Sequence, residues 1–157
     1  AAPFSFEEDY RPAPGIERFL CGTPPVLGLT ALECGVEIMA RVDMEQLRHK
    51  SLALGDLFIA IMDERCGDLG FTLLSPRESA LRGSQISYAH PQGYAIVQAL
   101  KERDVIGDFR APDVLRFGLT PLYLRYVDVF RAVDIIRDVV ISGAWDKPEY
   151  RERAAVT

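Results

Sequence analysis

Hydrophobic and polar residues alternate along residues 113–119, DVLRFGL, in the pattern typical of a half-buried β-strand. Because successive side chains of a strand point to opposite faces, one face of this strand is predicted to be hydrophobic. Its members are Leu115, Phe117 and Leu119. The other face then carries Arg116 beside Gly118, so a guanidinium lies next to open space. Either a carboxylate of the protein or a ligand is expected to fill that space.

Apolar residues at helical spacing predict four helices elsewhere in the chain. The first follows Pro24 and Pro25, which suit the start of a helix because its first turn does not use their missing amides. The second begins after Asp43, a good N-cap, with Gln46 in the position of a capping box. Gly143 is the predicted C-cap of the last helix. The predicted helices cover about residues 26–42, 44–65, a short stretch from Pro91, and 125–142.

Period-two alternation and turn residues predict four strands, the last two joined by the turn APD. The elements therefore follow one another as helix, helix, strand, strand, helix, strand, strand, helix. This order predicts an α+β two-layer sandwich, in which a small, mostly antiparallel sheet carries helices on one face. The predicted strands cover residues 71–75, 85–90, 105–110 and 114–119.

The chain is expected to contain one main domain, because 157 residues can bury one sizeable core. Residues 1–25 lack a helical stripe and are predicted to be an extended connecting and active-site segment. Residues 26–143 are predicted to form a small domain, and residues 144–157 a polar tail. The chain does not open with Met, which suggests that another segment precedes it.

Composition and charge narrow the classes of partner. A net charge of -5 argues against nucleic acid, because no basic stripe is present to neutralise phosphates. The longest apolar run, residues 51–62, is too short to span a bilayer, and no signal-peptide pattern is recognised. Three cysteines without metal-ligand spacing predict a reduced, cytoplasmic protein with buried or inert thiols and no metal site.

Arg116 is the strongest candidate for a binding site, because a guanidinium binds a carboxylate with two parallel hydrogen bonds. From the pattern alone, an internal ion pair with Asp108, Asp113 or another acid is favoured over a ligand. Thr23 is the second candidate, since its hydroxyl precedes a helix whose first amides are replaced by prolines. The alternative for Thr23, a helix N-cap, is again the more common one.

The chain shows no complete catalytic apparatus, so no catalytic residue is predicted within it. His49 lies among charged residues, and His90, before a proline, suits a turn or a cap. None of the three lysines lies in an apolar setting that would lower its pKa for Schiff-base chemistry. They are Lys50, Lys101 and Lys147.

Four strings of the sequence carry a resemblance: FLCGTPPVL at 19–27, LRGSQISYAHPQGYAIVQAL at 81–100, DVIGDFRAPDVLRFGLTPLY at 104–123 and VDVFRAVDII at 127–136. They resemble the C-terminal part of bacterial kynureninases. Kynureninases are pyridoxal phosphate enzymes of the aminotransferase-like fold type I group. The resemblance implies a homodimer that hydrolyses the Cβ–Cγ bond of L-kynurenine, or of its 3-hydroxy derivative, in tryptophan catabolism. The products from L-kynurenine would be anthranilate and L-alanine.

The resemblance also implies roles for two residues. Arg116 matches the arginine that binds the α-carboxylate of the substrate, and Thr23 matches a position near the cofactor, the substrate and the subunit interface. The lysine that holds pyridoxal phosphate, and the large domain that forms the dimer, would lie upstream of Ala1. This chain alone is therefore expected to be inactive. Two alternatives stay open: a non-catalytic module that binds a small carboxylate or a partner, and another fold type I enzyme such as a relative of cysteine desulfurases.

Overall fold

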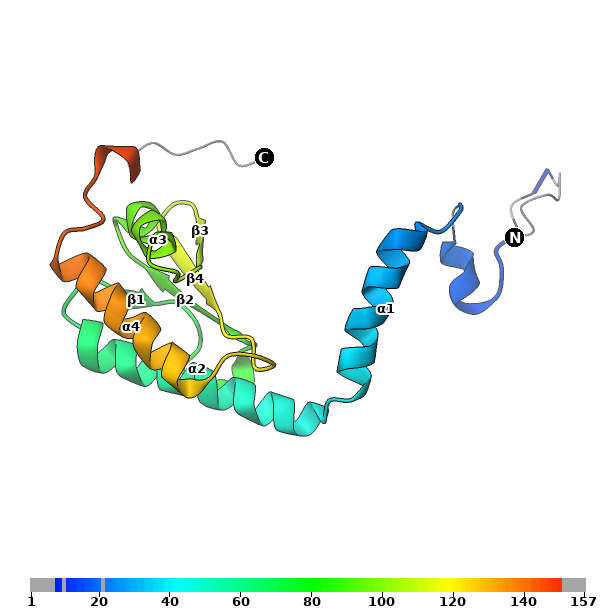
Figure 1. The fold of residues 1–157 in the computed structure, drawn as a ribbon, viewed down its shortest axis with the longest axis horizontal. Helices are drawn as coiled ribbons and strands as arrows, with labels where there is room; N and C mark the ends of the chain where they lie inside the picture. The colour runs from blue at the N-terminus through cyan, green and yellow to red at the C-terminus, as the bar shows by residue number, and fades with distance from the viewer. Residues whose placement is uncertain (1–7, 10, 21, 151–157) are drawn as a thin grey trace. The chain divides into compact units, whose positions relative to one another are not determined.

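The structure is a computed structural model, and it describes residues 8–9, 11–20 and 22–150. Packing divides the chain into two units, Ala1–Val42 and Asp43–Thr157, and each unit is described by itself. The division predicted at residues 25 and 143 stays a prediction. The helices and strands are labelled in Figure 1.

The first unit contains a short 3-10 helix, Gly15–Phe19, and helix α1, Val26–Ala40, which confirms the first predicted helix. Pro25 is the N-cap of α1, so both prolines precede its first turn. Glu33 and Glu37 lie one turn apart, and apolar residues take up most of the remaining circumference. The large apolar side chains of α1 are exposed among the described residues: Val26, Leu27, Leu29, Leu32, Val36, Ile38 and Met39.

The second unit has an α+β fold, which confirms the predicted fold class. Its four described strands form one antiparallel sheet in the order β1-β2-β4-β3. It also has two short 3-10 helices, Ser79–Leu81 in a connection and Pro148–Tyr150 after the last long helix. The longer elements are α2 Met44–Cys66, β1 Thr72–Leu73, β2 Gln85–Ala89, α3 Gly93–Lys101, β3 Asp108–Arg110, β4 Val114–Gly118 and α4 Tyr126–Ile141.

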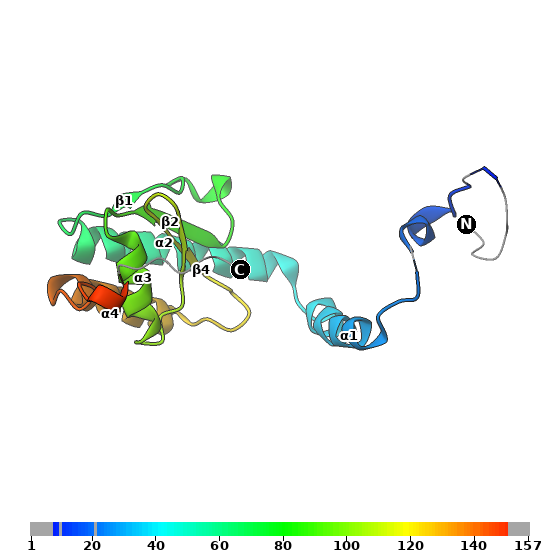
Figure 2. The ribbon, with the colours of Figure 1, turned by 90° about the horizontal axis from the view of Figure 1, so that it is seen from above.

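β4 lies between β2 and β3, and its alternation places hydrophobic side chains on the face of the sheet toward the helices. Leu115 and Phe117 of β4 are buried on this face, as predicted, together with Ile86 and Tyr88 of β2. Helices α2 and α3 pack on this face, and α4 packs against both helices (Figure 2). We call the opposite face the polar face; its polar members are Thr72, Gln85, Ser87, Asp108, Arg110 and Arg116.

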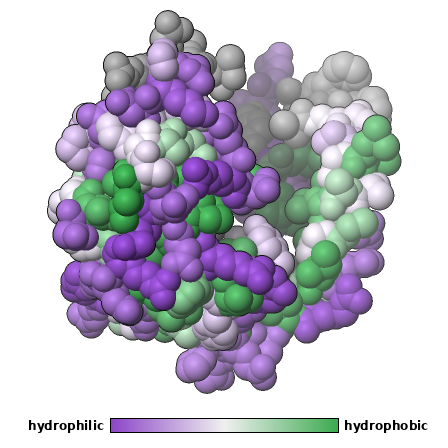
Figure 3. Space-filling view, turned by 60° about the vertical axis from the view of Figure 1, so that its left-hand side comes forward, coloured by the Kyte–Doolittle hydropathy of each residue, from purple (hydrophilic) through white to green (hydrophobic). Residues whose placement is uncertain are grey.

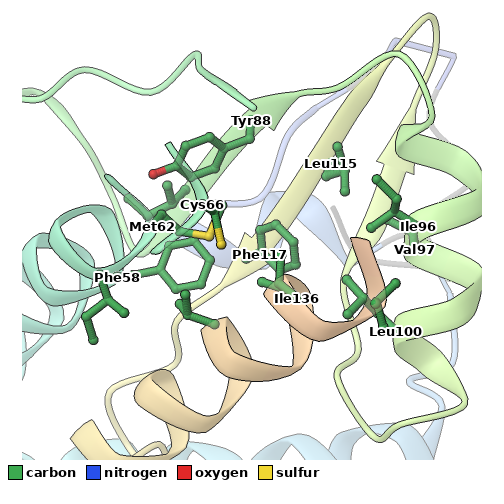
Figure 4. Packing of buried hydrophobic residues seen from close by; sticks show 14 of the residues in the cluster. Phe58, Met62, Cys66, Tyr88, Ile96, Val97, Leu100, Leu115, Phe117 and Ile136 are labelled. Atoms are coloured by element: carbon green, nitrogen blue, oxygen red, sulfur yellow. The ribbon is translucent and has the colours of Figure 1, made fainter. Parts of the chain in front are cut away.

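Phe58 of α2 joins the helices to the sheet. The centroid of its ring is 5.2 Å from that of Phe117 and 6.1 Å from that of Tyr88 (Figure 4). Val133 and Ile136 of α4 are fully buried in the same cluster. Burial of one such side chain contributes about 1.5–3 kcal/mol. The buried apolar residues that the structure describes all belong to the second unit, so the core is built there.

The starts of two helices differ in detail from the prediction. Asp43 is the N-cap of α2, as predicted, and its carboxylate accepts hydrogen bonds from backbone amides at 3.0 and 3.1 Å. The side chain of Gln46, however, donates to that carboxylate instead of accepting from the amide of Asp43. Helix α3 begins at Gly93 and not at Pro91, because the amide of Gly93 closes a turn onto the carbonyl of His90, at 2.8 Å.

Strand β3 begins three residues later than predicted, at Asp108. The amide of Val105 donates to the carbonyl of Leu100 at 3.0 Å, which ties the residues after α3 back to the helix. Gly107 then passes close to β4, since a Cβ atom there would lie 3.0 Å from the carbonyl oxygen of Arg116. Glycine therefore lets the chain enter the sheet directly beside β4.

A buried arginine holds the loop between β1 and β2 against α2. The side chain of Arg82 is only 2% exposed, and its guanidinium pairs with Asp56 of α2. The same guanidinium donates hydrogen bonds to the carbonyls of Pro76 and Arg77, at 3.0 and 2.5 Å. Arg82 thus fixes the loop from which β2 enters the sheet.

We expect Arg82→Met to lower the free energy of unfolding by at least about 2 kcal/mol, because a hydrogen bond from a charged donor contributes roughly 1.5–3 kcal/mol. Arg77→Met is the matched control, since Arg77 pairs with Asp63 at the surface. Such exposed pairs contribute about 0–1 kcal/mol. Urea unfolding at neutral pH measures both losses, and equal losses would contradict the anchoring role of Arg82.

Candidate functional site

Arg116 lies on β4 directly opposite Asp108 of β3. Two hydrogen bonds join the side chains: Nε of Arg116 donates to Oδ1 of Asp108 at 2.6 Å, and Nη2 donates to Oδ2 at 2.6 Å. The side chains are 28% and 50% exposed, so the pair lies at the surface and not beneath packed residues. Of the alternatives open from the sequence, the internal ion pair is therefore present, and its partner is Asp108.

Several cations act on the single carboxylate of Asp108. The hydrogen bond from Arg116 is the largest influence and holds the pKa of Asp108 below its usual range; Arg110 and Lys101 act in the same direction. The nearest approach of Arg110 is 3.7 Å, from Nη2 to Oδ2 of Asp108. These four side chains carry three positive charges and one negative charge. This corner of the sheet is thus locally positive although the whole chain has a net charge of -5.

Among the residues that the structure describes, the pair with Asp108 leaves one edge of the Arg116 guanidinium without a partner. A guanidinium has five N–H donors, and Asp108 accepts from Nε and from one hydrogen of Nη2. The remaining hydrogens of Nη1 and Nη2 form a second edge, which can hold another carboxylate with two parallel hydrogen bonds. Space exists next to Arg116, because a Cβ atom added at Gly118 would meet no atom within 4 Å among those described.

Thr23 lies in an exposed bend, two residues before the N-cap of α1. The alternative that Thr23 is itself the N-cap is wrong, because Pro25 holds that position and no side chain caps this helix. Thr23 belongs to the first unit and Arg116 to the second. A role of Thr23 toward a cofactor or a substrate stays a prediction.

The lysines of this chain do not have the environment of a Schiff-base residue. The ammonium of Lys50 donates to the carbonyl of Pro121 at 2.7 Å, and Lys101 is exposed at the end of α3. Hydrogen bonds to Tyr150 and Glu102 raise the pKa of Lys147, whereas Schiff-base chemistry needs a lowered one.

The remaining candidates for chemistry are structural. Cys66 is buried, and burial raises the pKa of its thiol to about 11, which fits the predicted inert thiol. Cys34 is exposed, so it is not a buried thiol, and whether it is inert stays a prediction. Cys21 lies outside the described residues. In the ranges that the structure describes, no cluster of three or more metal-ligating side chains is present. No helix within those ranges is long and apolar enough to cross a membrane.

A hollow that the sequence did not indicate lies on the helix side of the sheet. It has a volume of about 400 Å³, and Phe58, Phe117 and Asp128 are among its lining residues. Arg116 and Asp108 do not line it. Ile106, also in its lining, is 83% exposed. Figure 3 shows hydrophobic side chains interspersed with hydrophilic ones on one face of the surface. Gly118, which lies opposite Gln85 of the polar face, also lines the hollow, so the two features adjoin at that residue.

His90 occupies a turn, as predicted, and its ring is buried. Nδ1 accepts a hydrogen bond from the amide of Gln92 at 3.0 Å, so Nε2 carries the proton and donates to the carbonyl of Leu69 at 3.1 Å. The ring also packs on Phe71, with 4.8 Å between centroids. Burial lowers the pKa of His90 below its usual value of 6.5. The neutral ring is therefore the form that the fold prefers.

We expect the stability of the protein to fall as the pH drops below about 6.5, because the unfolded chain then binds a proton that buried His90 resists. The contribution of the neutral ring is complete above that pH and is lost as the pH falls toward the lower pKa of the folded state. Urea unfolding across this range should show a steeper loss for the native sequence than for His90→Asn, whose carbonyl can still accept from Gln92. Parallel curves would contradict the assignment.

Comparison with known proteins gives one family and a set of close relatives. The family described as the kynureninase C-terminal domain matches residues 47–136. Proteins named kynureninase from Burkholderia mallei (strain SAVP1) and Burkholderia pseudomallei (strain K96243) are each 50% identical over 156 residues, 99% of this chain and 38% of their own length. The kynureninase of Pseudomonas fluorescens is 47% identical over 154 residues, 98% of this chain and 37% of its own length. The chain thus spans less than two fifths of these curated relatives.

Proposed function

This chain belongs to the kynureninase C-terminal domain family, and from that premise we propose that it is the C-terminal part of a kynureninase. The intact protein would be a pyridoxal phosphate-dependent hydrolase that splits the Cβ–Cγ bond of L-kynurenine, or of 3-hydroxykynurenine, in tryptophan catabolism. From L-kynurenine it would release anthranilate and L-alanine. We further propose that it acts in the cytoplasm as a homodimer. The support is the name shared by relatives that match almost the whole chain at 47–50% identity.

The observation that carries the role of this chain is the second edge of the Arg116 guanidinium. We propose that this edge binds the α-carboxylate of the substrate with two parallel hydrogen bonds. A carboxylate held in this way cannot rotate freely, so the bonds at the neighbouring α-carbon keep one direction relative to the cofactor. Arg116 would then be a substrate-binding residue that orients the reacting bonds, and no catalytic group is assigned within this chain.

The residues of this chain fit only part of a pyridoxal phosphate site. When bound, the cofactor supplies the electron sink for the bonds at the α-carbon of the substrate. The exposed hydroxyl of Thr23 can donate a hydrogen bond to an anionic group of the cofactor or substrate. The lysines described above do not fit covalent attachment. We therefore propose that the attachment lysine belongs to a part of the protein outside this chain.

A second candidate function is a non-catalytic module that binds a small carboxylate. It would use the same edge of Arg116, and the unsuitable environment of the lysines favours it. The two functions differ in one respect, since only a kynureninase requires a cofactor-binding lysine within the same protein. The sequence of the gene on the 5′ side of the codon for Ala1 distinguishes them.

We expect Arg116→Gln, made in the full-length protein, to lower kcat/KM for L-kynurenine by more than tenfold, because two charge-assisted hydrogen bonds to the substrate are lost. A tenfold loss corresponds to about 1.4 kcal/mol. Arg77→Gln is the matched control, since Arg77 also forms a surface pair with an aspartate, Asp63. Steady-state kinetics of both variants test the role, and a loss below tenfold for Arg116→Gln would rule it out.

The 157-residue chain by itself is expected to have no kynureninase activity when pyridoxal phosphate is added. The reason is that Lys50 donates to the carbonyl of Pro121, Lys101 is exposed at the end of α3, and Lys147 is paired with Glu102. Release of anthranilate, followed by its fluorescence, is the measurement, with the full-length protein as the positive control. Turnover by the short chain would contradict this proposal.

A further inference from the structure

Resting on the proposed function, we propose that Asp108 is a positioning residue for the substrate carboxylate. It holds the Nε–Nη2 edge of Arg116, so that the other edge, Nη1 with the remaining hydrogen of Nη2, is presented to the α-carboxylate of the substrate. Asp108 itself does not touch the substrate. Its contribution is the orientation of the group that does.

Two parallel hydrogen bonds to Asp108 fix the orientation of the Arg116 guanidinium. Both hydrogen bonds from Arg116 to Asp108 measure 2.6 Å, and they use the side edge of the guanidinium. An arginine side chain without such a partner loses rotamer freedom when it is ordered, and that loss costs free energy. A pair formed before the substrate arrives removes much of that cost from binding. The planar guanidinium then points its free edge in one direction.

The backbone determines where Asp108 stands. In the pairing of β3 with β4, Asp108 lies directly opposite Arg116, so the two side chains emerge on the same face of the sheet. Gly107, the preceding residue, has room only for hydrogen, because a Cβ atom would meet the carbonyl of Arg116 at 3.0 Å and the ring of Phe117 at 3.2 Å. The close pairing of β3 and β4 therefore places the carboxylate of Asp108 next to the guanidinium of Arg116.

An anion beside the substrate site would normally repel a second carboxylate. Here the surrounding charge opposes that effect, since Arg110 and Lys101 act on Asp108 in addition to Arg116. The pKa of Asp108 is lowered, mainly through the hydrogen bond from Arg116, so the carboxylate stays ionised and the pair stays formed at neutral pH. The four groups together remain positive when Asp108 is ionised. A substrate carboxylate thus meets an oriented donor in a positive surrounding.

The test compares two ligands in the full-length protein loaded with its cofactor. L-Kynurenine carries the α-carboxylate, and L-kynurenine amide carries a neutral carboxamide in its place. We expect Asp108→Asn to raise the KM or inhibition constant of L-kynurenine at least fivefold and to change that of the amide less than twofold. A merely structural fault would weaken both ligands equally, so the ratio of the two constants reports orientation of Arg116.

Asp63→Asn is the matched control, because Asp63 forms a pair of the same kind with Arg77. It should leave both ligands unchanged. Asp108→Glu keeps the charge and should recover part of the preference for the carboxylate. A second readout is the Nε–H signal of Arg116 in ¹H–¹⁵N spectra of the full-length protein, which should move in Asp108→Asn and stay in Asp63→Asn.

The outcomes separate this inference from the proposed function. If Arg116→Gln leaves the discrimination between kynurenine and its amide intact, the proposed role of Arg116 fails. If Arg116→Gln abolishes the discrimination but Asp108→Asn retains it, only the positioning role of Asp108 is overturned. Tighter binding of kynurenine by Asp108→Asn would also overturn it, since Asp108 would then be a competitor for the guanidinium. Loss of discrimination in both variants supports both assignments.

Discussion

The pairing of β4 with both of its neighbours is the constraint on which the core and the candidate site depend. A strand sends alternate side chains to opposite faces, so the register that buries Leu115 and Phe117 also sends Arg116 outward. A shift by one residue would exchange the two sets and place a guanidinium in the core. The contact between Phe117 and Phe58 of α2 therefore helps to hold Arg116 in place.

The strands on either side of β4 determine which side chains surround Arg116. Gly107 brings β3 close to β4, and Asp108 is the next residue, so the partner of Arg116 is supplied by the backbone pairing itself. On the other side β2 places Ser87 opposite Arg116, and a serine leaves more room than a large side chain would. The polar face thus combines one oriented cation with small neighbours, which suits recognition of a compact anionic group.

Periodicity predicted most of the fold because burial of apolar residues determines it. Ser142, and not Gly143, is the C-cap of α4, and Gly143 follows it with a φ of 68°. The alternation around Arg116 and the N-cap at Asp43 follow from local chemistry and were predicted. The late start of β3 was not, because it results from a contact between Gly107 and β4 that no local pattern records. The choice of Asp108 over Asp113 likewise required the register. Arg82 was overlooked because two of its partners are backbone carbonyls and the third, Asp56, lies 26 residues away on α2, so no local pattern indicates the contacts.

Recognition of a carboxylate in an acidic protein depends on local charge and not on the total. The chain carries -5 overall, and at physiological ionic strength exposed charges beyond about 8 Å are largely screened. The groups that act on Asp108 lie within its immediate surroundings, where Arg116, Arg110 and Lys101 outnumber the single acid. A guanidinium already engaged on one edge keeps its charge and its remaining donors. Arg116 can therefore pair with Asp108 on one edge and still have donors for a substrate carboxylate on the other. The two alternatives that the sequence left open do not exclude each other.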